Sequence, residues 1–283
     1  MAALASVDGG RSLTAMVGMG AVAEGVLSNG MPNRRLGQGP PLVVAPGLTS
    51  EHVNPTGMQR RMTLSWAEPF ARHFTVHLLQ RKPGLASGAT MSDIAADYAA
   101  AIEDDIGGPV LLHGTSSGGS VALQLAIDRP ELIQRLVLAA AACRLSPKGR
   151  QVQIEVARLT RAGDHRGTAA LLFGTLAPGP LRYVARGVGW VMGGSFAVDD
   201  PSDMLTVIAA EDVFDAEPEL SRVTAPALVL GGSADTFYTA DLFNRTAAGI
   251  PGGRAVILPG KSHVHVAGSK AVAGIGLGFL LGG

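Results

Sequence analysis

The residues with the clearest chemical potential lie in a glycine-rich turn. Residues 114–118 read Gly-Thr-Ser-Ser-Gly, which places Ser116 at the centre of a G-x-S-x-G pattern. An apolar run at 110–113 precedes the turn, and an apolar segment at 121–127 follows it. This order predicts a strand, a sharp turn and a helix, with Ser116 at the apex. There the serine would lie near the positive end of the helix, where a developing negative charge on oxygen is stabilised.

Glycine is needed beside such an apex, because the turn strains the backbone and leaves no room for neighbouring side chains. Ser117 and Ser120 are alternative nucleophiles, but neither has glycine two residues away on both sides. The pattern could also be a simple Gly/Ser connection, since the chain holds 38 glycines. The apolar strand and helix around it favour Ser116 as a nucleophile.

A serine hydroxyl attacks at neutral pH only with a base beside it, commonly a histidine oriented by a carboxylate. Downstream of Ser116 the histidines are His165, His263 and His265. His165 falls between two expected helices, a poor position for a base that must stay fixed. His263 follows the apolar run 255–258 and a short loop, from which a side chain can reach the sheet edge. We therefore expect His263 to be the base, with His265 as its competitor.

Asp235 is the expected carboxylate, because it stands just past the apolar run 227–230. It would hold the imidazole in one tautomer and stabilise the imidazolium. Asp241 is the alternative, although its place on the following helix suggests a surface residue. A metal site at His263 and His265 is weaker, since no third ligand is indicated.

Two backbone N–H groups would be needed to bind the oxyanion of an acyl-transfer reaction. Ser117, directly after the nucleophile, would supply one of them. The other would come from Leu48, in the loop that follows the apolar run 42–45. Gly47 lets this loop approach closely, with an ordinary turn at Pro46 and Gly47 as the alternative.

The elements that must position these residues alternate between short apolar runs and helix-like stretches. Short runs without polar alternation are typical of strands covered on both faces, and strand–helix alternation predicts a mostly parallel, doubly wound α/β sheet. The expected strands are 42–45, 74–79, 110–113, 136–139, 227–230 and 255–258. The expected helices between them include 57–72, 91–103 and 118–127.

The interval between residues 138 and 227 contains no convincing strand. Helices are expected there at 148–162, 167–176, 181–192 and 201–214. Such an insertion predicts a cap over the carboxyl edge of the sheet, where open α/β sheets bind ligands. Residues 144–190 are mainly basic and residues 197–220 carry no basic side chain, so we expect the two halves to neutralise each other. The alternative is that an arginine reaches an anionic substrate.

Composition excludes several classes of function. Lys plus Arg and Asp plus Glu both number 23, so no strong overall field favours nucleic acid or an anionic membrane. A single cysteine, Cys143, excludes an intramolecular disulfide, and no run has the roughly 20 apolar residues of a membrane span. Residues 1–25 loosely imitate a secretory signal. We expect them to be a disordered extension of a cytoplasmic protein, with secretion as the alternative.

Taken together, these features resemble the α/β-hydrolase family with a helical cap, in its esterase and lipase-like branch. The resemblance covers roughly residues 26–282 and includes 37–44, 81–84, the G-x-S-x-G turn, 226–235 and 260–263. Members place nucleophile, acid and base in that order along the chain. This chain departs from many of them at Pro46, where a histidine is common, and at Gln80, where an acidic residue is common. The resemblance implies a core of residues 26–143 and 223–283 and a cap of residues 144–222.

The resemblance implies a serine hydrolase that cleaves a small carboxylic ester without a cofactor. Apolar cap residues would cover the acyl or aromatic part of the substrate, although packing between cap and core would account for most of them: Leu171, Leu172, Phe173, Val188, Trp190 and Met192. A carbon–carbon hydrolase, a lactonase, a perhydrolase or an acyltransferase would use the same triad. A small-molecule receptor with an intact but slow triad is the alternative outside enzymes.

Overall fold

One mixed sheet organises the molecule. In the computed structural model, which describes residues 21–177, 179–197 and 199–282, eight strands pair in the order β1-β2-β4-β3-β5-β6-β7-β8. The pairs β1–β2 and β2–β4 are antiparallel, and all other neighbours are parallel. The strands are β1 (Ala23–Val26), β2 (Pro32–Leu36), β3 (Pro41–Ala45), β4 (Thr75–Leu79), β5 (Val110–Thr115), β6 (Ile133–Ala139), β7 (Ala227–Gly232) and β8 (Arg254–Leu258).

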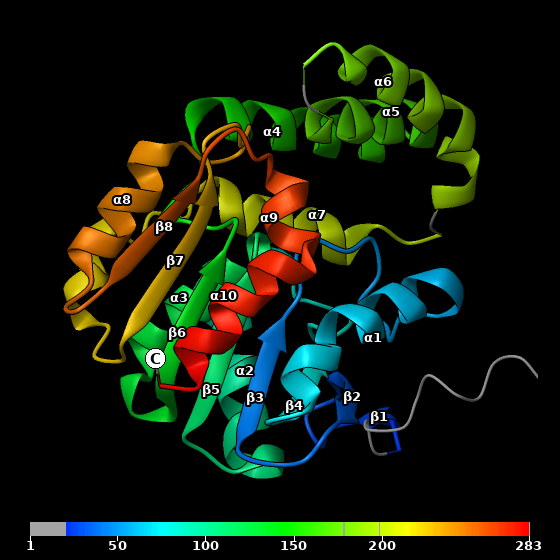
Figure 1. The fold of residues 1–283 in the computed structure, drawn as a ribbon. Helices are drawn as coiled ribbons and strands as arrows, with labels where there is room; N and C mark the ends of the chain where they lie inside the picture. Colours follow the sequence, from blue (N-terminus) through cyan, green and yellow to red (C-terminus); the bar gives the residue numbers. More distant parts are fainter. Residues whose placement is uncertain (1–20, 178, 198, 283) are drawn as a thin grey trace, which may run out of the picture.

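Helices cover both faces of this sheet (Figure 1). On one face lie α1 (Gly57–Ala71) and α10 (Lys270–Leu280), which the short α9 (His263–Gly268) precedes. On the other lie α2 (Met91–Ala101), α3 (Ser117–Asp128) and α8 (Ala240–Gly249). A short π-helical turn (Ile102–Ile106) continues α2, and a 3-10 turn (Pro130–Leu132) leads into β6.

The apolar runs become strands because both of their faces are buried. In β3, Leu42 and Val44 pack in the core beneath α1 and α10, whereas Val43 and Ala45 pack in the core beneath α2 and α3. Successive side chains of a strand point to opposite faces, so a strand between two helical layers must be apolar throughout. The expected α/β class and the six predicted strands are therefore confirmed, with small shifts at their ends.

Two strands differ from the prediction. Residues 23–26 form β1 and residues 32–36 form β2, so the expected extension over residues 1–25 is wrong for its last three residues. Neither strand is a continuous apolar run: β1 is exposed along its length, and β2 contains Arg34 and Arg35. The buried Arg34 guanidinium pairs with Glu24 of β1 at 2.9 Å. Residues 1–20, including most of the signal-like stretch, lie outside the described residues.

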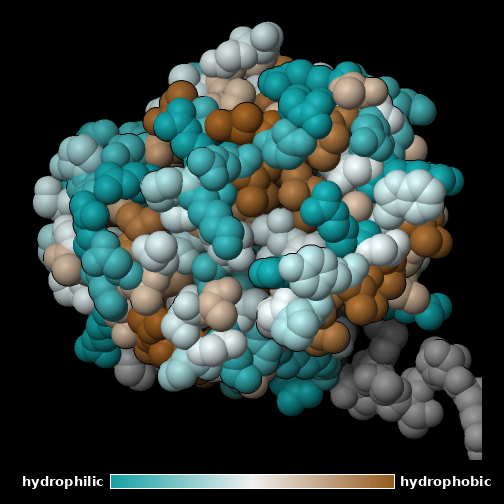
Figure 2. Space-filling model, turned by 90° about the horizontal axis from the view of Figure 1, so that it is seen from above, coloured by the Kyte–Doolittle hydropathy of each residue, from teal (hydrophilic) through white to brown (hydrophobic). Residues whose placement is uncertain are grey.

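The segment between β6 and β7 forms a helical insertion over the carboxyl edge of the sheet (Figure 1). It contains α4 (Pro147–Arg161), α5 (His165–Leu176), α6 (Leu181–Met192) and α7 (Ser202–Asp212), close to the four predicted helices. Short 3-10 turns follow α6 (Gly193–Phe196) and α7 (Glu217–Arg222). In Figure 2, which looks down on this side of the molecule, apolar side chains are exposed among hydrophilic ones. That the helical insertion forms a cap separate from the core stays a prediction.

An aspartate fastens the insertion to the core. Asp203 of α7 accepts hydrogen bonds from the backbone N–H groups of Gly84 and Leu85, at 2.9 and 2.7 Å. The buried His52 ring lies 3.5 Å from the same carboxylate, and burial lowers the pKa of His52. The loop after β4 is thereby tied to the end of the insertion furthest from it in sequence. Within the described residues, no helix is long and apolar enough to cross a membrane.

His113 of β5 is a buried histidine packed against aromatic rings. Its ring centroid lies 5.1 Å from that of Trp66 and 5.8 Å from that of Phe70. No described residue bonds to its Nδ1 atom. Burial lowers the pKa of His113 from 6.5 to about 4, so the ring is neutral in the folded protein above that pH.

We expect His113 to make stability depend on pH. As the pH falls from 6.5 towards 4, the unfolded chain binds a proton at this ring before the folded protein does, so the free energy of unfolding decreases. The full lowering of the His113 pKa corresponds to a decrease of about 3 kcal/mol in the free energy of unfolding. Urea unfolding of the wild type and His113→Leu across this range is the measurement. The variant should show the shallower pH dependence, and equal slopes would contradict this account.

Candidate active site

Ser116 sits at the apex of the turn between β5 and α3. Its backbone has φ 52° and ψ −126°, a left-handed conformation that is costly for a residue with a side chain. The Ser116 N–H group donates to the Ala139 carbonyl oxygen at 3.0 Å, which holds the apex against the neighbouring strand. A Cβ atom at Gly118 would overlap the carbonyl oxygens of Ala45 and Pro46. Glycine is therefore required where α3 meets the loop after β3.

The structure brings Ser116, His263 and Asp235 together from three separate parts of the chain. The Ser116 Oγ atom lies 3.0 Å from His263 Nε2, and His263 Nδ1 lies 2.8 Å from Asp235 Oδ2. The Asp235 side chain is fully buried, and its other oxygen accepts from the N–H groups of Phe237 and Tyr238 at 2.8 and 3.2 Å. The carboxylate is thus fixed on one side by the backbone and on the other by the imidazole.

Two aromatic rings enclose the imidazole of His263. The Tyr238 ring stacks on it with a centroid distance of 6.1 Å and an interplanar angle of 19°. The Phe237 ring lies at 4.9 Å in a tilted arrangement. The ring of His263 is therefore held in one plane by packing as well as by hydrogen bonds.

A buried carboxylate in α7 supports this arrangement from the insertion. Glu211 accepts from Ser120 Oγ at 2.8 Å, from Gln153 Nε2 at 2.8 Å and from the Tyr238 hydroxyl at 3.1 Å. These partners belong to α3, to α4 and to the segment after β7. Glu211 therefore joins the helix behind Ser116 to the tyrosine that stacks on His263.

The competing residues occupy other positions. Ser120 is buried and donates to Glu211, so it is not available as a nucleophile. His265 is exposed on α9, and Asp241 is exposed on α8, where it lies 3.7 Å from Arg245. His165 begins α5 and lines the cavity above Ser116 without bonding to it.

A buried arginine orders the loop after β3. Arg81 is fully buried and donates to the Gly47 and Pro46 carbonyl oxygens at 3.0 and 3.1 Å, and to Ser117 Oγ at 2.8 Å. In a trans peptide the C=O and N–H groups point in opposite directions. Because the Gly47 carbonyl faces Arg81, the Leu48 N–H group points away from the guanidinium. Among the described residues, no acceptor bonds to that N–H group.

Ser117 is the first residue of α3, so its N–H group has no partner in a preceding turn. A Cβ atom on Gly47 would lie 3.4 Å from that of Ser116. The two N–H donors expected from the sequence, those of Leu48 and Ser117, therefore belong to backbone segments on either side of Ser116. Their role in binding an oxyanion stays a prediction.

A cavity of about 530 Å³ opens above Ser116, between the sheet edge and the insertion. Its walls are largely apolar and include Leu48, Leu172, Phe173, Leu176 and Met204. Of the apolar residues expected to cover a substrate, Leu172 and Phe173 line this cavity. The expectation is wrong for Val188, Trp190 and Met192, which are about half exposed on α6. They line neither this cavity nor the second, smaller cavity that is described below.

The expected neutralisation between the two halves of the insertion is present at several positions. Arg144 pairs with Asp215 at 2.7 Å, and Arg150 pairs with Asp212 at 2.6 Å. Lys148, Arg182 and Arg186 of the insertion form no ion pair with a described residue and are considered below. No group of three or more His, Cys, Asp or Glu side chains suited to a metal ion occurs among the described residues.

Comparison with known proteins assigns the chain to a family. The model of the alpha/beta hydrolase family matches residues 14–275. The chain belongs to this family. Among curated proteins, this α/β hydrolase is 28% identical over 242 residues to polyketide synthase ThaQ of Burkholderia thailandensis. That match covers 81% of this chain and 11% of the synthase, so the chain spans about a tenth of that relative's length.

Solved structures resemble this α/β hydrolase over nearly its whole length. A hydrolase from Pseudomonas aeruginosa PA01 is 25% identical with a TM-score of 0.72, and the match covers 92% of this chain and 98% of that one. The enol-lactonase from Burkholderia xenovorans LB400 is 19% identical with a TM-score of 0.74, covering 92% and 100% of the two chains. The second likeness concerns the fold alone.

The arrangement of Ser116, His263 and Asp235 has a defined chemical capacity. A hydroxyl that is hydrogen-bonded to an imidazole can pass its proton to the ring while its oxygen attacks an electrophilic carbon. A carboxylate behind the ring stabilises the imidazolium that forms. Residue types and spacing indicated these three positions. No spacing signal pointed to Glu211 or to the rings around His263, and Arg81 was noted only within a segment shared with the family.

Proposed function

We propose that this α/β hydrolase cleaves carboxylic esters through an acyl-enzyme on Ser116. The observation that carries the proposal is the continuous hydrogen-bonded chain from Ser116 Oγ through His263 to Asp235, with distances of 3.0 and 2.8 Å. Both distances lie within the range for proton transfer between a nucleophile, its base and the group that orients the base.

His263 acts first as a base and then as an acid. Its Nε2 atom takes the Ser116 proton while Oγ attacks the ester carbon, and the carbonyl oxygen becomes an oxyanion between the Leu48 and Ser117 N–H groups. The imidazolium then gives its proton to the leaving alcohol. In the second half-reaction, His263 removes a proton from water, which attacks the acyl carbon. The bond to Ser116 Oγ then breaks, the imidazolium returns its proton to that oxygen, and the acid is released.

The acyl group occupies the apolar cavity above Ser116. Leu48 and Ser116 both line this cavity, so a carbonyl oxygen bound by the Leu48 N–H group directs the acyl chain into it. Leu172, Phe173 and Met204 of the insertion would cover the chain and exclude water from the oxyanion. In this role the insertion acts as the cap expected from the sequence.

The proposal can be tested by covalent trapping together with turnover. A fluorophosphonate should phosphonylate Ser116 Oγ with loss of fluoride, and peptide mass spectrometry should locate the adduct there. Hydrolysis of p-nitrophenyl esters with acyl chains of increasing length should proceed until the chain exceeds the cavity. A folded Ser116→Ala variant should neither label nor turn over.

Each outcome assigns the site differently. Full activity in the alanine variant would overturn the Ser116 mechanism. Labelling at Ser116 without hydrolysis of any ester would overturn ester hydrolysis and favour an acyltransferase, another hydrolase of the same triad or a ligand receptor. Turnover that stops beyond a certain acyl length supports both the reaction and the place of the acyl group.

A further inference from the structure

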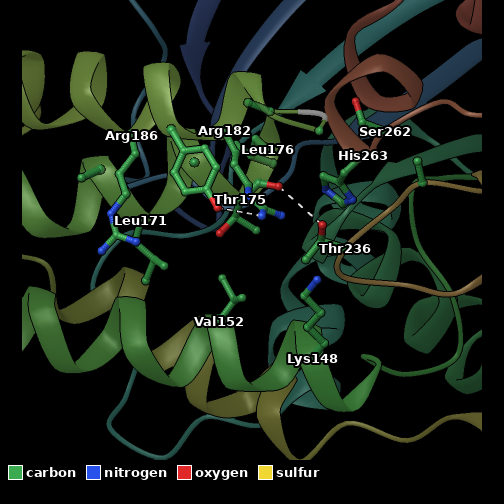
Figure 3. A pocket seen from close by; sticks show the side chains of 16 residues that line it. Lys148, Val152, Leu171, Thr175, Leu176, Arg182, Arg186, Thr236, Ser262 and His263 are labelled. Carbon is green, nitrogen blue, oxygen red and sulfur yellow. Dashed lines mark hydrogen bonds between the residues drawn. The ribbon is translucent and has the colours of Figure 1, made fainter.

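His263 also lines a second cavity, of about 360 Å³ (Figure 3). Its walls come from α4, α5 and α6 of the insertion and from the loops after β7 and β8. His263 and Leu176 line both cavities, whereas Ser116 and Leu48 line only the larger one. His263 and Leu176 therefore belong to the walls of both cavities.

Three cations line the smaller cavity without an acidic residue among its lining residues: Lys148, Arg182 and Arg186. Lys148 extends from α4 and the two arginines extend from α6 towards the same space (Figure 3). The Tyr183 hydroxyl accepts from Arg182 at 2.9 Å, and the arginine also lies over the tyrosine ring. None of the three cations forms an ion pair with a described residue, unlike Arg144 and Arg150 nearby.

Hydroxyl groups accompany these charges at the end nearest His263. Ser262 and Thr236 both line the cavity, and Lys148 points towards Thr236 in Figure 3. The Thr236 hydroxyl donates to the Thr175 carbonyl oxygen at 3.5 Å, which leaves the Ser262 hydroxyl as a donor. Ammonium and guanidinium groups with a hydroxyl donor can bind carboxylate and phosphate oxygens. The cavity thus offers positive charge and hydrogen-bond donors to an anionic group bound within it.

The position of the smaller cavity indicates which part of an ester it would bind. The imidazole must protonate the leaving oxygen, so the leaving group lies on the His263 side of the ester carbon. The acyl chain fills the larger cavity, which contains Ser116. Because His263 also lines the smaller cavity, a leaving group that extends past the imidazole away from the acyl chain would enter it.

We propose that the cavity lined by Lys148, Arg182 and Arg186 binds a carboxylate or phosphate carried by the leaving group. This inference rests on the proposed esterase function and specifies the substrate class of that same site. The larger cavity selects an apolar acyl group, and the smaller one selects an anionic alcohol. Coulomb attraction to exposed cations is screened by salt, so the selection should weaken as ionic strength rises.

The test compares butyrate esters that differ in the group, and hence in the charge, at the far end of the leaving group. The alcohols are methyl 4-hydroxybenzoate, 4-hydroxybenzoate and 4-hydroxyphenyl phosphate, which are neutral, a carboxylate and a phosphate. Each kcat/KM is divided by the rate of hydrolysis of the same ester in hydroxide, which removes differences in intrinsic reactivity. The wild type should favour at least one anionic ester by about tenfold or more, and that ester identifies the anion.

Substitutions then assign the preference to the cavity. Arg182→Met and Lys148→Met should each lower the anionic-to-neutral ratio by about tenfold, the effect of losing one charge-assisted contact. Arg161→Met is the matched control, because Arg161 is an exposed arginine of α4 that lines neither cavity. It should leave the ratio unchanged.

Failure of this inference can be distinguished from failure of the esterase proposal. Ser116-dependent hydrolysis with no anion preference would overturn the inference alone. Absence of hydrolysis of every ester would overturn the proposed function, and titration of Ser116→Ala with 4-hydroxybenzoate and 4-hydroxyphenyl phosphate then tests the cavity directly. Binding that Arg182→Met weakens would still support an anion site there, and no binding of either compound would overturn it.

Discussion

Replacement of Ser116 by alanine is expected to lower kcat for ester hydrolysis by about 10⁴–10⁶-fold. The variant would lack the atom that forms the proposed acyl-enzyme, while the proposed oxyanion donors and the apolar cavity would remain. The residual rate should therefore stay above that of the uncatalysed reaction. Steady-state kinetics on a p-nitrophenyl ester measures the loss, and thermal unfolding checks that the variant folds.

His263→Gln provides the control for this interpretation. If Ser116 and His263 act as one unit, the double variant should lose little more activity than either single variant. Losses that multiply in the double variant would mean that the two residues act independently. That result would contradict a proton transfer across the 3.0 Å contact between them.

Replacement of Arg81 by methionine should have the second largest effect, on both stability and rate. Methionine leaves the carbonyl oxygens of Pro46 and Gly47 and the Ser117 hydroxyl without the donor that holds them. Loss of buried, charge-assisted bonds should lower the free energy of unfolding by about 3 kcal/mol. Because the Gly47–Leu48 peptide is then free to turn, kcat should fall by about 10²-fold, the scale of losing one oxyanion donor.

Comparison of kcat with KM separates this positioning role from a general loss of structure. Arg81 lines neither cavity, so KM for a neutral ester should change much less than kcat in the folded fraction of Arg81→Met. Arg81→Lys, which keeps the charge and part of the hydrogen bonding, should recover part of both stability and rate. An unchanged kcat in a destabilised Arg81→Met variant would show that the arginine stabilises the loop without positioning the donor.

The central strands and the Ser116 turn could be predicted from the sequence. Strands buried on both faces require continuous apolar runs, and the tight turn requires glycines. The run at 42–45 is apolar because both faces of β3 contact helices. The antiparallel strands β1 and β2 at the edge of the sheet were not predicted, because they lack such apolar runs. β1 is exposed and β2 carries arginines, so neither has the pattern of a doubly covered strand.

Within the candidate site, a residue could be predicted where it stands at the end of an expected strand, whatever its distance along the chain from its partner. Ser116, Asp235 and His263 each stand directly after an expected strand or its loop, and parallel strands bring such positions to one edge. The contacts of Arg81 and Glu211 join segments that no local pattern relates. Glu211, for example, meets Ser120, which is 91 residues away. The apolar residues of α6 were misplaced because an amphipathic pattern does not say which face meets the substrate.

The backbone at Ser116 also has a thermodynamic consequence. A side-chain-bearing residue held at φ 52° costs roughly 1–3 kcal/mol relative to a relaxed conformation, and the hydrogen bond to Ala139 maintains it. A glycine at this position would relieve that cost and remove the reactive hydroxyl. Selection for stability alone would therefore favour a residue that cannot perform the proposed reaction, so the serine persists in the fold at the expense of its stability.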